Sequence, residues 1–180
     1  MGSRWPVLSA LSIISILLPH GTTIPTMAWL RLIRWQNLII ILLTQWVVWW
    51  CIVLPSGPVV LHATFFLLLS LSTTMIAAAG YIINDYFDIR IDQINRPQTV
   101  VLGKVIARKS AIIAHTVLNV AAILLAGRVA MQAQHYSLLL LQLGCTGLLW
   151  VYSTTYKRRY ETGNIIVATL TALTVLGLYA

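Results

Sequence analysis

Long apolar stretches alternate with short polar connections along this chain. Five such stretches occupy residues 38–54, 61–83, 111–127, 136–152 and 165–180. Each has about the length that crosses the hydrocarbon core of a bilayer as a helix. A segment that crosses a membrane alone must satisfy its own backbone hydrogen bonds, so each stretch is predicted to be helical. The pattern therefore predicts an all-α fold, a polytopic transmembrane helix bundle.

Composition supports the same class. Hydrophobic residues make up 59% of the 180 residues and charged residues only 9%, whereas about a quarter of the residues in soluble domains are charged. The net charge is +8, but the basic residues lie in the connections between apolar stretches. No nucleic-acid-binding motif accompanies them, so we expect the bilayer as the partner and no nucleic acid.

The basic residues occupy every second connection. Arg31 and Arg34 precede the first stretch, and further clusters follow the second and the fourth. The connection after the first stretch has no Lys or Arg, and the one after the third has only Arg128. Because basic connections remain on the cytoplasmic side, we expect a multi-pass protein of the inner or plasma membrane. The connection that follows the second stretch is then cytoplasmic.

The first 28 residues fit this topology poorly. Arg4 and the apolar run at residues 7–18 have the outline of a signal peptide, but the run is short for a span. A spanning helix there would reverse the orientation of everything that follows. We therefore expect residues 1–28 to form an N-terminal extension or an interfacial segment, and residues 29–180 to form the membrane domain.

All three aspartates of the chain lie within nine residues at the end of the second stretch, and Glu161 is the only other acidic residue. No Pro or Gly separates Tyr81 from Asp92, so the helix is predicted to continue through them. At 3.6 residues per turn, Asp85, Asp88 and Asp92 share one face, and Asn84 borders it. Ionisable groups are costly beside a bilayer, so this face is a candidate functional site.

Three carboxylates this close repel one another unless a cation neutralises them. Mg²⁺ binds such oxygen donors and completes its shell with water and phosphate oxygens. Basic residues that can bind phosphate lie on the same predicted side: Arg96, Lys104, Arg108, Lys109, Lys157 and Arg158. The sequence therefore predicts a Mg²⁺–phosphate or Mg²⁺–diphosphate site with Asp85, Asp88 and Asp92 as the metal ligands.

Residues 84–92, Asn-Asp-Tyr-Phe-Asp-Ile-Arg-Ile-Asp, followed by Asn-Arg-Pro, resemble the first Asp-rich motif of the UbiA superfamily of intramembrane prenyltransferases. Weaker matches at residues 30–38, 100–104 and 152–164 follow the family's order. The resemblance implies a bundle of nine helices, of which about five are present, around a cavity open to lipid. It also implies that Mg²⁺ assists transfer of a prenyl group from a polyprenyl diphosphate to a lipid or aromatic acceptor.

By position, the resemblance assigns catalytic and metal-binding roles to Asp85, Asp88 and Asp92. It assigns diphosphate contacts to five further residues: Asn84, Arg96, Lys104, Tyr152 and Lys157. The residues of the motif are most similar to those of enzymes that act on geranylgeranylglycerol phosphate. Enzymes that prenylate quinone precursors are the near alternative.

Other readings stay open at this point. The chain has no second Asp-rich motif, so we expect the N-terminal portion of a longer enzyme, and an inactive or partner-dependent fragment is the alternative. A cation transporter would also place carboxylates in a membrane, but it would place them near the middle of the spans. A CDP-alcohol phosphotransferase would need Gly and Ala-Arg where residues 87–90 have Phe-Asp-Ile-Arg.

Overall fold

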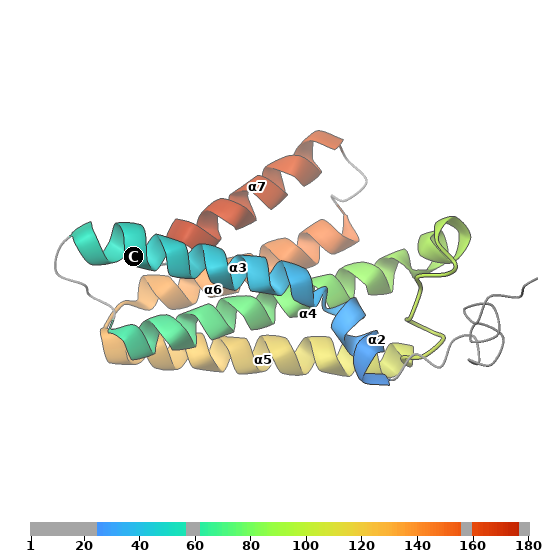
Figure 1. Ribbon diagram of the computed structural model, residues 1–180, viewed down its shortest axis with the longest axis horizontal. Helices are drawn as coiled ribbons and strands as arrows, with labels where there is room; N and C mark the ends of the chain where they lie inside the picture. The colour runs from blue at the N-terminus through green and yellow to red at the C-terminus, as the bar shows by residue number, and fades with distance from the viewer. Residues whose placement is uncertain (1–24, 57–61, 156–159, 177–180) are drawn as a thin grey trace, which may run out of the picture.

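The computed structural model describes residues 25–56, 62–155 and 160–176, and its named elements are all helices (Figure 1). The α-helices are α2 (Pro25–Leu32), α3 (Trp35–Val48), α4 (Ala63–Asn95), α5 (Arg108–Ala133), α6 (Tyr136–Thr154) and α7 (Tyr160–Leu176). A π-helical turn, η1 (Trp49–Val53), and a 3-10 turn, η2 (Leu54–Ser56), continue α3. The predicted all-α class is confirmed.

The predicted apolar stretches correspond to helices. Four helical spans in the described residues are long and apolar enough to cross a membrane: Trp35–Val53, Ala63–Asn95, Arg108–Ala133 and Tyr136–Thr154. The fifth stretch lies in α7, whose apolar part, Gly163–Thr174, is shorter in the part of the chain that is described. The bundle therefore has the architecture that the hydrophobic pattern predicts.

The central helix of the bundle is α4, which lies between α5, α6 and α3 (Figure 1). In its most apolar window 61% of the residues are buried, compared with 11% in the span that contains α3. A methyl group added at Gly80 would lie 3.0 Å from Leu149 Cδ1, so glycine permits the close approach of α4 and α6. His115 on α5 bonds to the Ala79 carbonyl through Nδ1 at 3.0 Å, which ties α5 to α4 at the same level.

We call the end of the bundle where α4 stops the motif end. Arg96 there leaves the helical conformation, with φ −142° and ψ 56°, because a residue before proline is disfavoured in a helix. The connection beyond it folds back, since the amides of Val105 and Ile106 donate to the Val101 carbonyl. Leu102 and Ile106 are buried against Ile89 of α4 together with the short helix α2. This packing fixes α2 and the connection beside the aspartates.

The boundary that we expected after residue 28 lies inside α2, which begins at Pro25. Proline suits the first position of a helix because its missing N–H has no helical acceptor there. Most of the predicted N-terminal segment, residues 1–24, lies outside the described residues. The division into an extension and a membrane domain therefore stays a prediction.

Candidate functional site

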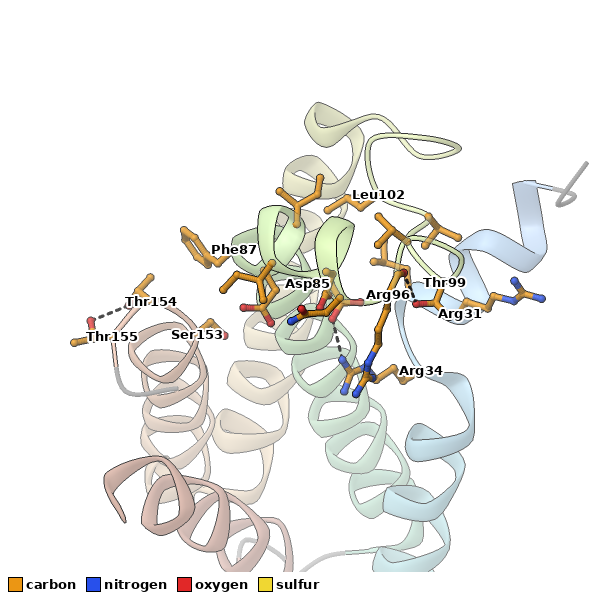
Figure 2. A pocket seen from close by; sticks show the side chains of 18 residues that line it. Arg31, Arg34, Asp85, Phe87, Arg96, Thr99, Leu102, Ser153, Thr154 and Thr155 are labelled. Atoms are coloured by element: carbon orange, nitrogen blue, oxygen red, sulfur yellow. Dashed lines mark hydrogen bonds and ion pairs between the residues drawn. The ribbon is translucent and has the colours of Figure 1, made fainter. Parts of the chain in front are cut away.

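The three aspartates lie on the last turns of α4, which continues without a break to Asn95 as the sequence predicts. All three line one cavity of about 920 Å³ at the motif end, the motif cavity (Figure 2). Its walls are the end of α4, the joint between α2 and α3, residues 95–102, and the end of α6. Its polar lining consists of Arg31, Arg34, Asp85, Asp88, Asp92, Asn95, Arg96, Thr99, Ser153, Thr154 and Thr155.

Arg34 forms a direct contact with the Asp-rich face. Its Nη2 donates to Asp85 Oδ1 at 2.9 Å across 51 residues of sequence, as the dashed line in Figure 2 shows. The guanidinium carbon also lies 5.2 Å from the centroid of the Tyr81 ring, within the range of a cation–π contact. Arg34 therefore belongs to the site, although the sequence alone suggested only a role in topology.

The backbone of Arg34 explains how its side chain reaches Asp85. Arg34 has φ 52° and ψ 55°, the left-handed conformation, where the chain turns from α2 into α3. This conformation costs about 1–2 kcal/mol for a residue other than glycine. The burial of Leu32 and the ion pair with Asp85 hold the turn in place. The joint thereby directs a guanidinium group into the motif cavity.

The charges in the motif cavity are balanced. Three carboxylates, from Asp85, Asp88 and Asp92, share its lining with three guanidinium groups, from Arg31, Arg34 and Arg96. Figure 2 shows the Arg96 side chain extending toward Arg34, so two cations lie on one side of Asp85. A metal–diphosphate complex carries little net charge and would contact both kinds of group without disturbing this balance.

Nowhere in the described residues are three His, Cys, Asp or Glu side chains close enough to hold one metal ion together. Mg²⁺ does not require such a cage, since it is usually held by one or two carboxylates plus water and substrate phosphate. The carboxylates of the motif cavity and the Ser153, Thr154 and Thr155 hydroxyls are oxygen donors of the kind it prefers. The donor set therefore fits a Mg²⁺ ion that arrives with its phosphate ligand.

The other predicted site residues separate into three groups. Arg96 lines the motif cavity, and its contact with diphosphate stays a prediction. Asn84 and Tyr152 line a second cavity directly beneath it. Lys104 lies outside both cavities, and its Nζ donates to the Pro97 carbonyl at 2.7 Å. Lys157 lies outside the described residues.

The second cavity, the inner cavity, has a volume of about 460 Å³ and lies among α3, α4, α6 and α7. Arg34 and Ser153 line both cavities, so the two are adjacent. Its middle section is apolar and is lined by Ile40, Ile41, Ile76, Ala77, Gly80, Cys145, Leu149, Val167 and Leu170. A charged cavity thus continues into an apolar one. No single segment of the sequence indicates this junction, because residues far apart in the chain form it.

Comparisons of the sequence and the fold with known proteins give one consistent result. The profile of the UbiA prenyltransferase family matches residues 44–180. A digeranylgeranylglyceryl phosphate synthase of Saccharolobus solfataricus is 33% identical over 110 residues, which cover 61% of this chain and 37% of that protein. One of Thermococcus sibiricus is 36% identical over 95 residues, which cover 53% of this chain and 32% of that protein.

A solved structure shows the same fold. It comes from work on the biosynthesis of digeranylgeranylglyceryl phosphate synthase in membranes, and it superposes with a TM-score of 0.72 at 24% identity. The superposition covers 86% of this chain and 52% of that chain. The matches thus cover about a third of the length of the curated relatives and about half of the solved chain.

Proposed function

Because the chain belongs to the UbiA prenyltransferase family, we propose that it binds a polyprenyl diphosphate with Mg²⁺ and takes part in transfer of the prenyl group to a lipid acceptor. It is a multi-pass integral membrane protein, with four helices able to span a bilayer in the described residues. The orientation of the basic connections supports placing the motif cavity on the cytoplasmic side. We assign this role to residues 29–180.

The observation that carries the proposal is the junction of the two cavities. A polyprenyl diphosphate has a charged head and a long apolar tail, and the junction at Arg34 and Ser153 joins a charged cavity to an apolar one. In this arrangement the diphosphate lies among the carboxylates and guanidinium groups, and the tail extends between α3, α4, α6 and α7. Each half of the substrate then meets groups of its own polarity.

Each part of the motif cavity has a proposed role. Asp85, Asp88 and Asp92 would supply one or two carboxylates to each Mg²⁺ ion, which when bound would stabilise the charge of the departing diphosphate. Arg34 and Arg96 line the same cavity as the carboxylates and would bind phosphate oxygens there. Asn84 and Tyr152 lie where the first carbons of the tail would enter the inner cavity. Lys104 and Lys157 stay predicted diphosphate contacts.

The proposal also concerns the identity of the acceptor. The relatives are named as synthases of digeranylgeranylglyceryl phosphate, which supports a geranylgeranylated glycerol phosphate as the acceptor. A quinone precursor is the alternative. Incubating the reconstituted chain with labelled geranylgeranyl diphosphate and each acceptor in turn tests this choice, because the labelled product carries either a phosphate or an aromatic ring. Absence of transfer to both would support the inactive or partner-dependent fragment.

Substrate binding is tested most directly at Asp88. The chain is placed in lipid nanodiscs, and its affinity for geranylgeranyl thiodiphosphate, a slowly reacting analogue, is measured with and without Mg²⁺. Loss of a metal ligand is expected to lower the Mg²⁺-dependent affinity of Asp88→Asn by about a hundredfold. Arg90→Gln is the matched control, since Arg90 is exposed on α4 and lies outside both cavities. Equal affinity of Asp88→Asn and the unmodified chain would contradict the proposal.

A further inference from the structure

The inner cavity is apolar along its middle and polar at its deep end. The lining residues farthest from the motif cavity are Thr44 on α3, Thr73 on α4 and Gln142 on α6. The described part of α7 adds Thr171 and Thr174 at the same end. We call Thr44, Thr73, Gln142 and Thr174 the polar floor. Four separate helices thus change from apolar to polar lining at this end of the cavity.

A hydrogen bond crosses the polar floor. Gln142 Nε2 on α6 donates to Thr73 Oγ1 on α4 at 2.8 Å. The Thr73 hydroxyl donates in turn to the Leu69 carbonyl of its own helix at 3.0 Å. Thr44 donates in the same way to the Ile40 carbonyl at 2.8 Å. The hydroxyl hydrogens are therefore already used, and the bond between Gln142 and Thr73 links the two helices directly below the apolar section.

Packed side chains close the bundle beyond the polar floor. Trp49 and Phe66 stack with ring centroids 4.4 Å apart, and Leu69 and Leu138 are buried in the same cluster. Gln45 follows Thr44 on α3, and Ser70 lies one turn from Thr73 on α4. Gln45 Oε1 and Ser70 Oγ are buried without a hydrogen-bond partner among the described residues. An apolar group that entered this region would offer no partner to these atoms.

The apolar section of the inner cavity has the same length along α4 and along α6. Asn84 at the mouth and Thr73 at the floor are eleven positions apart on α4, and Ser153 and Gln142 are eleven positions apart on α6. At a rise of 1.5 Å per residue each interval is about 16 Å long. An extended isoprene unit measures about 5 Å, given carbon–carbon bonds near 1.5 Å. The section therefore holds about three extended units, or four when the chain bends.

We propose that the polar floor limits the length of the prenyl chain that the inner cavity accepts. This inference rests on the proposed function, because it assumes that a prenyl tail enters the cavity from the motif end. Each unit added above the floor buries apolar surface and tightens binding. A unit that reaches the floor must break the bond between Gln142 and Thr73 and leave polar atoms without partners, which opposes further gain. Farnesyl and geranylgeranyl chains then fit, and the next longer chain does not.

The test measures affinity as a function of chain length. Geranyl, farnesyl, geranylgeranyl and geranylfarnesyl thiodiphosphates are titrated with Mg²⁺ into the 180-residue chain in nanodiscs. Affinity is expected to rise up to the geranylgeranyl compound and to stop rising at the geranylfarnesyl compound. In the double variant Thr73→Val with Gln142→Leu, the floor loses its polar groups at similar volume. The geranylfarnesyl compound should then bind about tenfold tighter than it binds the unmodified chain, with little change for the geranyl compound.

The matched control is Thr116→Val, which removes an equivalent hydroxyl that donates to the Ile112 carbonyl on an exposed face of α5. It should leave the length profile unchanged. Melting temperatures of all variants distinguish a limit on chain length from a merely structural role of the polar floor. A merely structural role would lower stability without shifting the dependence of affinity on chain length. A rise in affinity through the geranylfarnesyl compound in the unmodified chain, or an unchanged profile in the double variant, overturns the inference alone. If no member of the series binds with Mg²⁺, the proposed function fails as well.

Discussion

The motif cavity places three carboxylates and three guanidinium groups along its wall, whereas the inner cavity has one charged residue in its described lining, Arg34. Both cavities use Arg34, α4 and α6, and the same central helix supplies the aspartates of one and part of the apolar wall of the other. The two linings differ in charge because their residues lie at different positions along α4. Charged groups are tolerated beyond the apolar length of the helix and would be costly within it.

The largest expected effect comes from removing the metal. With EDTA in place of Mg²⁺, the affinity of the chain for geranylgeranyl thiodiphosphate should fall by about a hundredfold, because the carboxylates then repel the diphosphate. Geranylgeraniol, which has the tail without the charge, should bind equally well under both conditions. Fluorescence titration in nanodiscs measures both ligands. Equal losses for both would mean that the two cavities do not act separately.

A bulky side chain at Gly80 should affect the inner cavity most. Gly80→Val would force Leu149 away from α4, because a methyl group at Gly80 already lies 3.0 Å from Leu149 Cδ1. Overpacking of this kind costs about 1–3 kcal/mol and should also weaken geranylgeraniol binding. Thermal unfolding in detergent measures the first effect and titration the second. Unaltered stability would show that α4 and α6 can separate freely at this level.

Arg34 should matter to both cavities, since it lines both. Arg34→Gln removes its charge and the ion pair with Asp85, and diphosphate affinity is expected to fall about tenfold, the range of one hydrogen bond to a charged group. Arg34→Lys keeps the charge but loses the paired donors, and it should recover only part of the affinity. Stability should change little, because the Arg34 side chain is 45% exposed and such pairs contribute about 0–1 kcal/mol. Affinity equal to the unmodified chain in both variants would remove Arg34 from the site.

A smaller effect, on stability alone, is expected at His115, which lines neither cavity. His115→Ala breaks its bond to the Ala79 carbonyl and should lower the free energy of unfolding by about 1 kcal/mol. The ratio of diphosphate to geranylgeraniol affinity should not change. A shift of that ratio at constant stability would indicate that α5 positions the motif as well as supporting α4.

The local features of the site were predictable because they depend on residues close together in sequence. Asp85, Asp88 and Asp92 share a helix face by periodicity alone, and the absence of Pro or Gly before Asp92 allows α4 to run on. The end of α4 at Arg96 has an equally local cause, since proline follows it. The predicted roles of these residues, unlike their positions, await the experiments above.

The contacts between distant residues were not predictable in the same way. Arg34 was read from the sequence as a marker of membrane orientation, and its left-handed joint and its bond to Asp85 appear only in the folded chain. Lys104, with similar charge and closer in sequence to the aspartates, turned out to bond to the Pro97 carbonyl outside the cavity. Proximity in sequence was a poor guide to which cations would line the motif cavity.

The amino-acid sequence by itself determined the membrane class, the helices and the acidic face, because hydrophobic length and helical periodicity are properties of single segments. Tertiary structure decided that a charged cavity meets an apolar one at Arg34 and Ser153, and that Thr73 and Gln142 are hydrogen-bonded at the deep end. These features join segments dozens of residues apart. Their geometry follows from how helices pack against one another, which no single segment specifies.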